Sequence, residues 1–436
     1  MRRWMGLIVP LLLLTLLLEG RGVLHAAPPP ARLAGATTPV DVSQAPSDEE
    51  DAIYPDLARA SSGTLYALWC DNRNDLGFDL FLASSTDRGA SWSTPAAVVL
   101  TENAVPVRSS LVLDGTQLRI AWAEWTAGLE YQLYQLDVGG SPRLIPNEYT
   151  FLANQPSMAL GAGGELHLVS EGGLPSSNKL SIIYSRRLAG ASNWMTTTVV
   201  YSHTARSSSF DPQLAVSADG SRLHLVWNKR RVHQWTILYT EGIVGSSQVT
   251  WTTPITISGD MTTTWSPDIA VDAAGNLHVV WPEILAQDEQ YVDYARYDAA
   301  LGQWEEATRI GGPFRVNANN PYGTLPTVAA SEFVAGAVCV AWNAFPRSTS
   351  TAEDIQLLCS PDGGVTWTTW DNMSRSAADG TVSIRPAMAM APGNTAHVIW
   401  QELVPGGSAG STDYQIYHAR RLPLGIYLPV IIKMVL

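Results

Sequence analysis

A tryptophan recurs along this chain at nearly even intervals, each time at the end of a short hydrophobic run. The runs are LYALW, LRIAW, LHLVW, LHVVW, AVCVAW and AHVIW, and a further copy, LHLVS, has Ser170 in place of the tryptophan. The seven positions are 69, 122, 170, 227, 281, 342 and 400. A period of this size is the signature of stacked copies of one supersecondary unit. The sequence therefore predicts a repeat array and directs the search for function to the loops at one end of its units.

The clearest copy, residues 266–304, predicts four antiparallel strands. SPDIAV, LHVVW and YVDYARY are the first three strands, the turn DAAGN supplies a glycine for positive φ, and LGQW opens the fourth strand. Four strands in about 50 residues is the size of one β-propeller blade. The chain is thus predicted to be an all-β propeller of four-stranded blades, with seven blades favoured and six as the alternative. The predicted blades start near residues 54, 108, 155, 211, 266, 325 and 385.

The last copy lacks a fourth strand, because the chain leaves the pattern after YHARR at residues 417–421. The missing strand is found at the other end of the repeat. TTPVDVS at 37–43 nearly repeats TTPITIS at 252–258, which is a fourth strand in its own copy. We therefore expect residues 39–43 to pair with about 414–420 and to close the ring, which removes the open sheet edges that promote aggregation.

The two ends of the chain are predicted to lie outside the propeller, which spans residues 39–422. Residues 1–26 have two arginines before a short apolar run and small residues near Ala26, which is typical of a cleaved secretion signal. Residues 27–38 are rich in proline and alanine and are expected to form a linker. The apolar tail, residues 423–436, is too short to span a membrane and is either a surface-retention signal or a packed end strand. We expect a secreted, extracellular monomer with no transmembrane segment, associated with the cell surface if the tail retains it.

The composition argues against several functions. The net charge of −13 does not fit nucleic acid, whose phosphates need a basic surface. Four of the eight histidines occupy the same place in the second-strand motif, which is a repeat position and not a metal cluster. They are His167, His224, His278 and His397. We expect no metal site and no cofactor, and nothing indicates a structural calcium ion.

The three cysteines are consistent with one disulfide in an exported protein. Cys339 and Cys359 would lie opposite each other in a hairpin centred near residue 349, so a cross-strand bridge is feasible, although opposition alone does not guarantee it. Cys70 is expected to be a small buried apolar residue.

Two segments fit the pattern Ser-x-Asp-x-Gly-x-x-Trp, and both lie between the third and fourth strands of their copies. One contains Ser85, Asp87, Gly89 and Trp92, and the other Ser360, Asp362, Gly364 and Trp367. The chemistry suits a turn, since the carboxylate accepts backbone N–H groups and the glycine takes the left-handed conformation. Weaker versions end at Trp194, Trp251 and Trp304.

With this Asp-box pattern, residues 37–422 resemble the sialidase-like, BNR-repeat propellers. The resemblance implies the fold, and in that superfamily the Asp box is structural and lies away from the active site. This chain departs from the enzymes. They typically have six blades, three substrate-binding arginines, a Tyr/Glu nucleophile pair and an acid/base Asp, and that set is not assignable here. The segment IYPDLA at 53–58 lacks the arginine of the Arg-Ile-Pro-type motif, and Arg108 and Arg385 are the nearest equivalents of the three arginines.

In a propeller, the loop before the first strand and the loop after the second strand of every blade open on the same face. Carboxylates follow the recurring tryptophan position in five copies, at Asp71, Glu124, Glu171, Glu283 and Glu402. The starts of the first strands carry Tyr54, Arg108, Asp211 and Arg385. Trp125 and Trp265 lie in the same loops and are candidate platforms for sugar rings.

These residues have two interpretations. As a ligand site at the mouth of the central channel, the carboxylates would bind sugar hydroxyls or a cation, and the arginines an anionic group. As structural elements, the carboxylates would bond the backbone of neighbouring blades, and their recurrence favours this interpretation for them.

Two functions remain open. A secreted, non-catalytic propeller would bind carbohydrate or a cell-surface protein through its acidic channel-mouth face. Alternatively, a glycoside hydrolase of the exo-sialidase type would need two carboxyl groups, or a carboxyl and a Tyr/Glu pair, converging on one sugar. The sequence does not decide whether the chain is an enzyme, and no catalytic residue is assigned.

Overall fold

The computed structural model describes residues 35–45, 51–74, 77–100, 106–126, 130–149, 154–173, 179–202, 207–232, 234–259, 263–285, 289–315, 323–344, 353–375, 382–405 and 412–422. The predicted signal peptide, the C-terminal tail and most of the predicted linker lie outside these ranges. No helix in the described ranges is long and apolar enough to cross a membrane.

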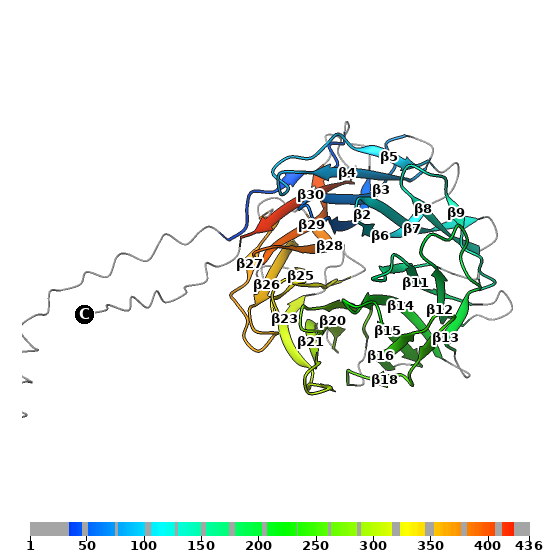
Figure 1. The fold of residues 1–436 in the computed structure, drawn as a ribbon. Coiled ribbons are helices and arrows are strands. Elements are labelled where there is room, and N and C mark those ends of the chain that lie inside the picture. The colour runs from blue at the N-terminus through cyan, green and yellow to red at the C-terminus, as the bar shows by residue number, and fades with distance from the viewer. Residues whose placement is uncertain are drawn as a thin grey trace, which may run out of the picture. The chain divides into compact units, whose positions relative to one another are not determined.

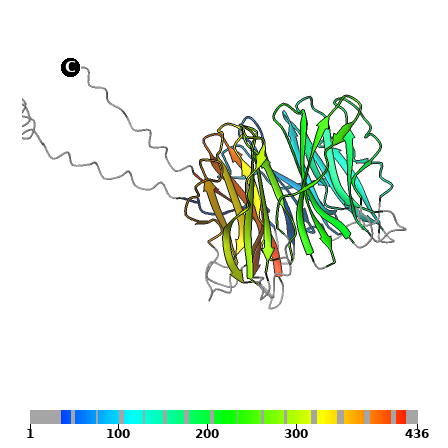
Figure 2. The ribbon, with the colours of Figure 1, turned by 90° about the horizontal axis from the view of Figure 1, so that it is seen from below.

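The described chain from Ala36 onward forms seven antiparallel sheets arranged in a ring (Figure 1), and the strands run lengthwise between its two faces (Figure 2). Blade 1 consists of β2 (Ala52–Arg59), β3 (Leu65–Asp71), β4 (Asp79–Ser85) and β5 (Ala96–Val99). Blade 2 consists of β6 (Pro106–Asp114), β7 (Gln117–Thr126), β8 (Glu130–Asp137) and β9 (Arg143–Leu144). Blade 3 consists of β10 (Ser157–Leu160), β11 (Leu166–Gly172), β12 (Ser181–Arg187) and β13 (Thr198–Tyr201). Blade 4 consists of β14 (Ser207–Val216), β15 (Arg222–Arg231), β16 (Gln234–Val244), β17 (Val249–Trp251) and β18 (Ile255–Thr256). Blade 5 consists of β19 (Asp268–Val271), β20 (Leu277–Ile284), β21 (Glu289–Asp298), β22 (Gln303–Trp304) and β23 (Thr308–Arg315). Blades 6 and 7 consist of β24 (Thr327–Ala330), β25 (Val338–Ala344), β26 (Asp354–Ser360) and β27 (Asp371–Asn372); and β28 (Val382–Ala391), β29 (Thr395–Pro405), β30 (Thr412–Arg421) and β1 (Val40–Asp41).

Each blade has four strand positions, which follow the sequence order from the channel outward in blades 1 to 6; in blade 7 the outermost position is taken by β1. In blades 4 and 5 the fourth position is split into two segments, because β18 pairs with β16 and β23 pairs with β21. The first strands of successive blades contact one another all the way round, and β28 contacts β2. The prediction of seven blades is therefore confirmed over six.

The ring closes through the N-terminal strand. Strand β1 pairs antiparallel with β30, with Val40 opposite His418 and Asp41 opposite Tyr417. Next to this pair, the backbone N–H of Val42 donates to the carbonyl of Ile416 at 2.7 Å. In Figure 1 the blue start and the red end of the described chain lie side by side. The closure predicted for residues 39–43 is confirmed.

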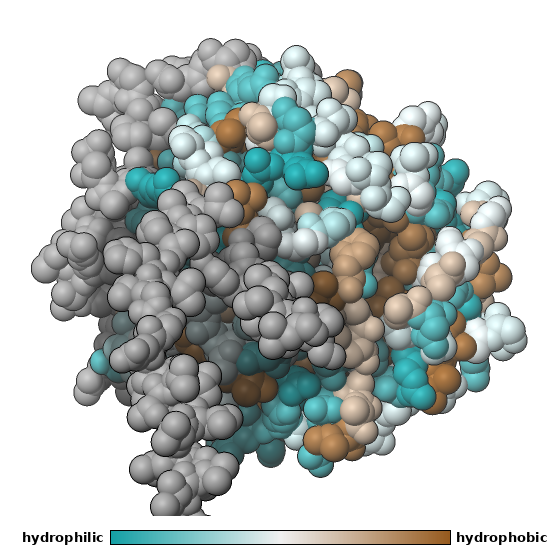
Figure 3. All heavy atoms as spheres, turned by 60° about the vertical axis from the view of Figure 1, so that its left-hand side comes forward, coloured by the Kyte–Doolittle hydropathy of each residue, from teal (hydrophilic) through white to brown (hydrophobic). Residues whose placement is uncertain are grey.

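The hydrophobic core lies between the blades. Seven clusters of buried residues each join two neighbouring blades, so every interface of the ring has one. The six recurring tryptophans are the largest fully buried side chains, which explains why the sequence repeats them. Ser170, the exception, is also fully buried. On the surface shown in Figure 3, hydrophobic residues form separate patches among hydrophilic ones.

Two cysteines lie where the hairpin pattern placed them. Cys339 and Cys359 face each other across β25 and β26 and are joined by a disulfide, with their Cα atoms 4.1 Å apart. Cys70 is fully buried, and this burial raises the pKa of its thiol.

Both segments that fit the Asp-box pattern form the same turn. In the first, the Ser85 hydroxyl donates to Asp87 and accepts the N–H of Gly89, both at 2.8 Å, and Asp87 also accepts the N–H of Ser91. The Ser91 hydroxyl, the Ser91 N–H and the Ser85 hydroxyl all donate to Asp87 and lower its pKa to about 2. In the second, Ser360 and Asp362 make the same contacts. The turn also docks on the preceding blade, where the Tyr294 hydroxyl donates to the Gly363 carbonyl at 2.9 Å.

We expect Gly364→Ala to destabilise the propeller by about 1–3 kcal/mol more than Gly63→Ala, because it adds overpacking. Both glycines have positive φ, +90° and +92°, so the backbone strain of the two substitutions is matched. A Cβ at Gly364 would lie 2.6 Å from the Tyr294 ring carbon Cε1, whereas one at Gly63 would meet nothing within 4 Å. Urea unfolding of the two variants measures the difference. Equal losses of stability would show that the turn does not dock tightly.

Candidate functional site at the channel mouth

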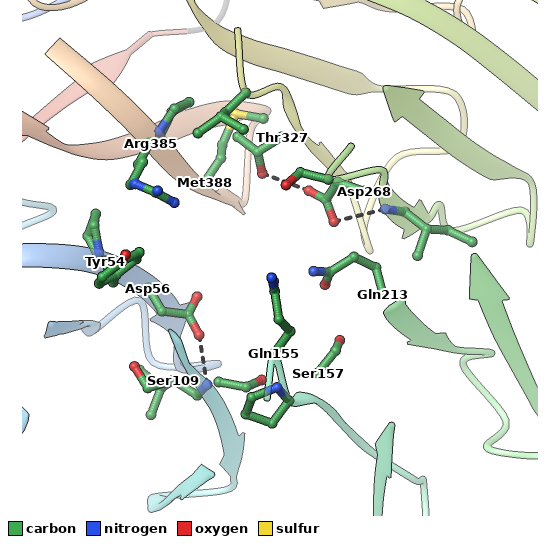
Figure 4. Close-up of a pocket in the computed structure, with 18 of the residues that line it drawn as sticks. Tyr54, Asp56, Ser109, Gln155, Ser157, Gln213, Asp268, Thr327, Arg385 and Met388 are labelled. Carbon is green, nitrogen blue, oxygen red and sulfur yellow. Dashed lines mark hydrogen bonds between the residues drawn. The ribbon is translucent and has the colours of Figure 1, made fainter. Parts of the chain in front are cut away.

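The first strands of the blades surround a cavity of about 500 Å³. It is lined by residues from all seven blades, chiefly the short segments around the proline that opens most first strands. The side chains of Arg385, Gln155 and Gln213 point into it (Figure 4). A polar cavity of this size is within the range of small-molecule sites, about 300–1,000 Å³.

The backbone turns side chains toward this cavity at the residue before the proline. Tyr54, Gln155, Ser266 and Arg385 all have positive φ, between 42° and 58°, and all line the cavity. Asp211 has the same backbone, with φ of 51°. The strands are bulged beside Tyr54, Asp211 and Arg385, as the shifts in pairing register show. A bulge of this kind re-aims a side chain and costs about 1–3 kcal/mol in backbone strain for a residue other than glycine.

Arg385 and Tyr54 form a pair at the mouth, on blades 7 and 1. The guanidinium carbon of Arg385 lies 4.5 Å from the centre of the Tyr54 ring, which is a cation–π contact. The N–H of Tyr54 donates to the side-chain carbonyl of Gln401 at 3.1 Å, so the pair is fixed to the end of the blade 7 second strand. The two side chains therefore present a planar cation and an aromatic ring together.

The wall of the cavity below the mouth is held by side chains that bond the next blade. Asp56 accepts the N–H of Leu111 at 2.7 Å, and Asp268 accepts the N–H of Val328 at 2.9 Å. Ser110 and Ser157 do the same for blades 3 and 4, at 3.0 Å each. Burial raises the pKa of Asp56 to about 6, although the N–H bonds to its carboxylate act to lower that pKa. Burial also raises the pKa of Asp268. These two carboxyls thus join the blades.

Three of the predicted carboxylates make contacts that hold the repeat together. The indole N–H of Trp69 donates to Asp71 at 2.8 Å, and that of Trp400 donates to Glu402 at 2.8 Å. Asp71 is also paired with Arg73. Glu171 accepts the N–H of Asp211, in the next blade, at 3.3 Å. Of these three, Glu171 bonds the backbone of a neighbouring blade, as the structural interpretation expects, whereas Asp71 and Glu402 bond a side chain of their own blade.

Asp211 is buried and belongs to the same inter-blade network. It accepts the side-chain amide of Asn228 at 2.9 Å and the N–H of Ser266, in blade 5, at 3.1 Å. In blade 6, Asn343 accepts the N–H of Leu325 at 2.8 Å. Carboxylate or amide side chains therefore hold the start of a first strand in several blades.

Glu124 and Glu283 depart from this pattern, although they stand two residues after a recurring tryptophan as Asp71 and Glu402 do. In the described part of the chain, the indole N–H groups of Trp122 and Trp281 have no partner. Glu283 is instead paired with Arg309, which also contacts Asp293 at 3.1 Å. Glu124 is half-buried, and burial raises its pKa.

The candidate platforms differ in their surroundings. Trp125 packs edge-on against Tyr131 at 4.8 Å across the blade 2 hairpin. Tyr131 receives a hydrogen bond from the Asn154 side chain, and its pKa is raised, first by burial and then by interactions with Tyr54 and Glu171. This aromatic pair thus lies next to the mouth. Trp265 precedes Ser266, and its buried indole N–H has no partner among the residues that the structure describes.

The described residues do not assemble the sialidase set at the cavity. Among the described side chains, Arg385 is the only arginine that lines it; the side chain of Arg108 is outside the described part, although its backbone is in β6. A Tyr–Glu hydrogen bond does occur, from Tyr291 to Glu289 at 2.8 Å, with Arg309 stacked 3.7 Å above the tyrosine ring. Neither member of that bond lines the cavity.

Sequence reasoning missed six polar residues of the cavity that occupy one repeat position. They are Asp56, Ser110, Ser157, Gln213, Asp268 and Thr327, each two residues after the residue that precedes or would precede the proline. The signal in the sequence is this recurring offset, which has the polar–apolar alternation of an ordinary strand.

Comparison with known proteins agrees with this architecture. The model of the BNR repeat-containing family matches residues 176–400, which is more than half of the 436 residues. No curated protein matches the sequence.

Two of the three solved structures that follow, with TM-scores above 0.5, show the same fold at low sequence identity. A protein of unknown function from Dyadobacter fermentans is 12% identical, with 89% of this chain and 100% of that chain covered and a TM-score of 0.51. An ulvan lyase, polysaccharide lyase PL25, is 10% identical over 88% of this chain and 93% of its own, with a TM-score of 0.55. The NanB sialidase from Streptococcus pneumoniae is 12% identical over 91% and 71%, with a TM-score of 0.48. Together with the family match over more than half of its length, the seven-bladed ring shows that this chain belongs to the BNR repeat-containing family.

Proposed function

We propose that the propeller binds carbohydrate in the cavity at the channel mouth. The observation that carries the proposal is the stacked Arg385–Tyr54 pair, which lines a cavity of about 500 Å³ together with Gln155 and Gln213. Tyr54, Gln155 and Arg385 occupy the same place in the repeat and differ in residue type, so this place does not require one kind of side chain.

The chemistry of the mouth favours an acidic sugar. A guanidinium binds a carboxylate or sulfate through two parallel N–H groups. The glutamine amides supply both donors and acceptors for hydroxyls, and the Tyr54 ring offers an apolar face. The structurally similar ulvan lyase was solved with a bound -[GlcA(1-4)Rha3S]- unit, a sugar that carries both a carboxylate and a sulfate.

Binding is favoured over glycoside hydrolysis by the state of the carboxyls. Hydrolysis needs two carboxyl groups, or a carboxyl and a Tyr/Glu pair, on either side of one sugar. Asp56 and Asp268 each accept backbone N–H groups of two segments. Moving either carboxyl toward a sugar would break these bonds and open a blade interface.

We expect Arg385→Ala to weaken the binding of an acidic oligosaccharide about tenfold or more, because a charged hydrogen bond contributes about 1.5–3 kcal/mol. Isothermal titration with glucuronic-acid-containing and neutral oligosaccharides measures the loss. Arg230→Ala is the matched control, since Arg230 also stacks on an aromatic ring, Trp235 at 5.5 Å, but does not line the cavity.

Two results would count against the proposal. Equal binding by Arg385→Ala and the wild-type protein would place the site elsewhere. Release of 4-methylumbelliferone from a glycoside panel, abolished by Arg385→Ala, would instead establish a glycoside hydrolase.

The proposal includes export, since an extracellular glycan is reached only outside the cell. The basic, apolar and small-residue segments of residues 1–26 support it. N-terminal sequencing of protein recovered from the medium should start near Ala27. A chain retained inside the cell with Met1 intact would contradict export and leave carbohydrate binding at the mouth to be judged by titration.

A further inference from the structure

A second cavity opens between the outer strands of blades 5 and 6 and shares no residue with the channel-mouth cavity. Its volume is about 370 Å³. We call it the rim slot, and we define it by residues 308–310 of β23 together with Leu358, Val365, Trp367 and Trp370 of blade 6. Aliphatic and aromatic side chains line it together with the polar side chains of Thr308, Arg309 and Thr368.

Trp370 has no counterpart in the other blades. Five blades have a tryptophan at the end of an Asp-box-like turn, namely Trp92, Trp194, Trp251, Trp304 and Trp367. Three residues later, the other four have Pro95, Thr197, Pro254 and Ala307, and only blade 6 has a second tryptophan. The repeat therefore does not require an aromatic residue here.

Packing holds Trp370 in place while leaving much of it open. Its ring lies 5.6 Å from that of Trp342, edge to face, and 5.8 Å from that of Phe314. It is nevertheless 47% exposed, and Val365 at the lip of the slot is 70% exposed. Trp367 is anchored edge-on to Tyr294 at 5.1 Å. Two fixed indoles thus line one small hollow, and Trp370 leaves part of its ring at the surface.

We propose that the rim slot binds a neutral saccharide, with one sugar ring stacked on Trp370. The face of an indole carries partial negative charge, which attracts the polarised C–H groups on the flat side of a pyranose. The Thr368 hydroxyl accepts the N–H of Cys359 at 3.2 Å and keeps its own hydrogen for a sugar oxygen. The same combination of an aromatic floor and edge hydroxyls suits a sugar better than a purely apolar ligand.

The charge and the size of the slot select this ligand class. Arg309, the charged residue that lines the slot, is already paired with Glu283 and Asp293, so its guanidinium offers little to an anionic sugar. The volume of about 370 Å³ is near the lower end of small-molecule pockets.

The test is isothermal titration of the exported chain with cellohexaose, xylohexaose, maltohexaose and mannohexaose. We expect at least one of these neutral probes to bind, and Trp370→Thr to weaken that binding about tenfold by removing the stacked ring. Trp370→Thr gives blade 6 the residue type that blade 3 has at Thr197, and its thermal unfolding is recorded to verify the fold. Val365→Glu, at an exposed position, is the second variant, and it should weaken binding without affecting the fold.

Two outcomes would overturn the inference: no neutral probe binds, or binding is unchanged in both variants. The result is separable from the channel-mouth proposal. Trp370→Thr should leave the binding of glucuronic-acid-containing probes as it is in the wild-type protein, so either site can fail while the other stands.

Discussion

A chain that lacks residues 36–43 is expected to lose the closed, cooperatively unfolding propeller. The deletion removes β1 and with it the fourth strand of blade 7. It also removes Val42, which is fully buried in the cluster between blades 7 and 1, and Ser43, whose hydroxyl accepts the N–H of Ile416 at 3.0 Å. The freed edge of β30 would present unpaired N–H and carbonyl groups to other chains. Urea unfolding and light scattering should show a lower midpoint and aggregation.

A point variant separates closure from chain length. Val42→Asp buries a charge without a partner. We expect it to lower the free energy of unfolding by about 3–5 kcal/mol, because a buried unpaired charge is among the few defects that cause losses this large. Thr38→Ala is the control, since Thr38 is exposed in the same segment. Wild-type stability in both the deletion and Val42→Asp would contradict closure by the N-terminal strand.

The free energy of unfolding is expected to fall as the pH falls from about 6.5 to about 4. Burial lowers the pKa of His224 and of His397 to about 4, and that of His418 to about 3. The unfolded chain takes up these protons below its ordinary histidine pKa near 6.5, and the folded chain does so only near 4 or below. The unfolded state therefore binds more protons in this window, so stability is full above it and is lost within it. Asp56, whose pKa is raised to about 6, acts in the opposite direction and offsets part of the loss.

His224→Gln should flatten this pH dependence. Its share is on the order of 3 kcal/mol, the free energy of a shift of about two pKa units or slightly more. Tyr239→Phe is the matched control, because it removes the partner of His224 Nδ1 at 2.9 Å but leaves the titrating ring in place. Urea unfolding at about pH 8 and about pH 4.5 measures the difference. An unchanged pH dependence in His224→Gln would contradict the assignment.

The fold followed from the sequence because the blade interfaces repeat one solution. Each recurring tryptophan is buried against the preceding blade, so the hydrophobic pattern alone marks the blades and their register. The closing strand could be predicted for the same reason. A fourth strand packs in the same surroundings in every blade, so residues 37–43 resemble the fourth strand of another copy. The six-blade alternative could be excluded only by the pairing of all the sheets.

The site was less predictable, because side-chain direction at the mouth depends on the backbone. The residue before a proline normally adopts extended conformations. Tyr54 and Arg385 instead have φ of 56° and 55°, and this brings them together across the joint of blades 7 and 1. Nothing in the spacing of two residues 331 positions apart indicates that contact. Likewise, Asp71 and Glu124 stand at the same place in the repeat, and only the structure shows that one receives a tryptophan N–H.

The most direct test of carbohydrate binding at the channel mouth is a crystal structure of the propeller with a glucuronic-acid-containing oligosaccharide. We predict density for a sugar in the cavity, with its carboxylate within hydrogen-bonding distance of Arg385 and a ring against Tyr54. An empty cavity, or a sugar bound with Arg385 and Tyr54 untouched, would contradict the account.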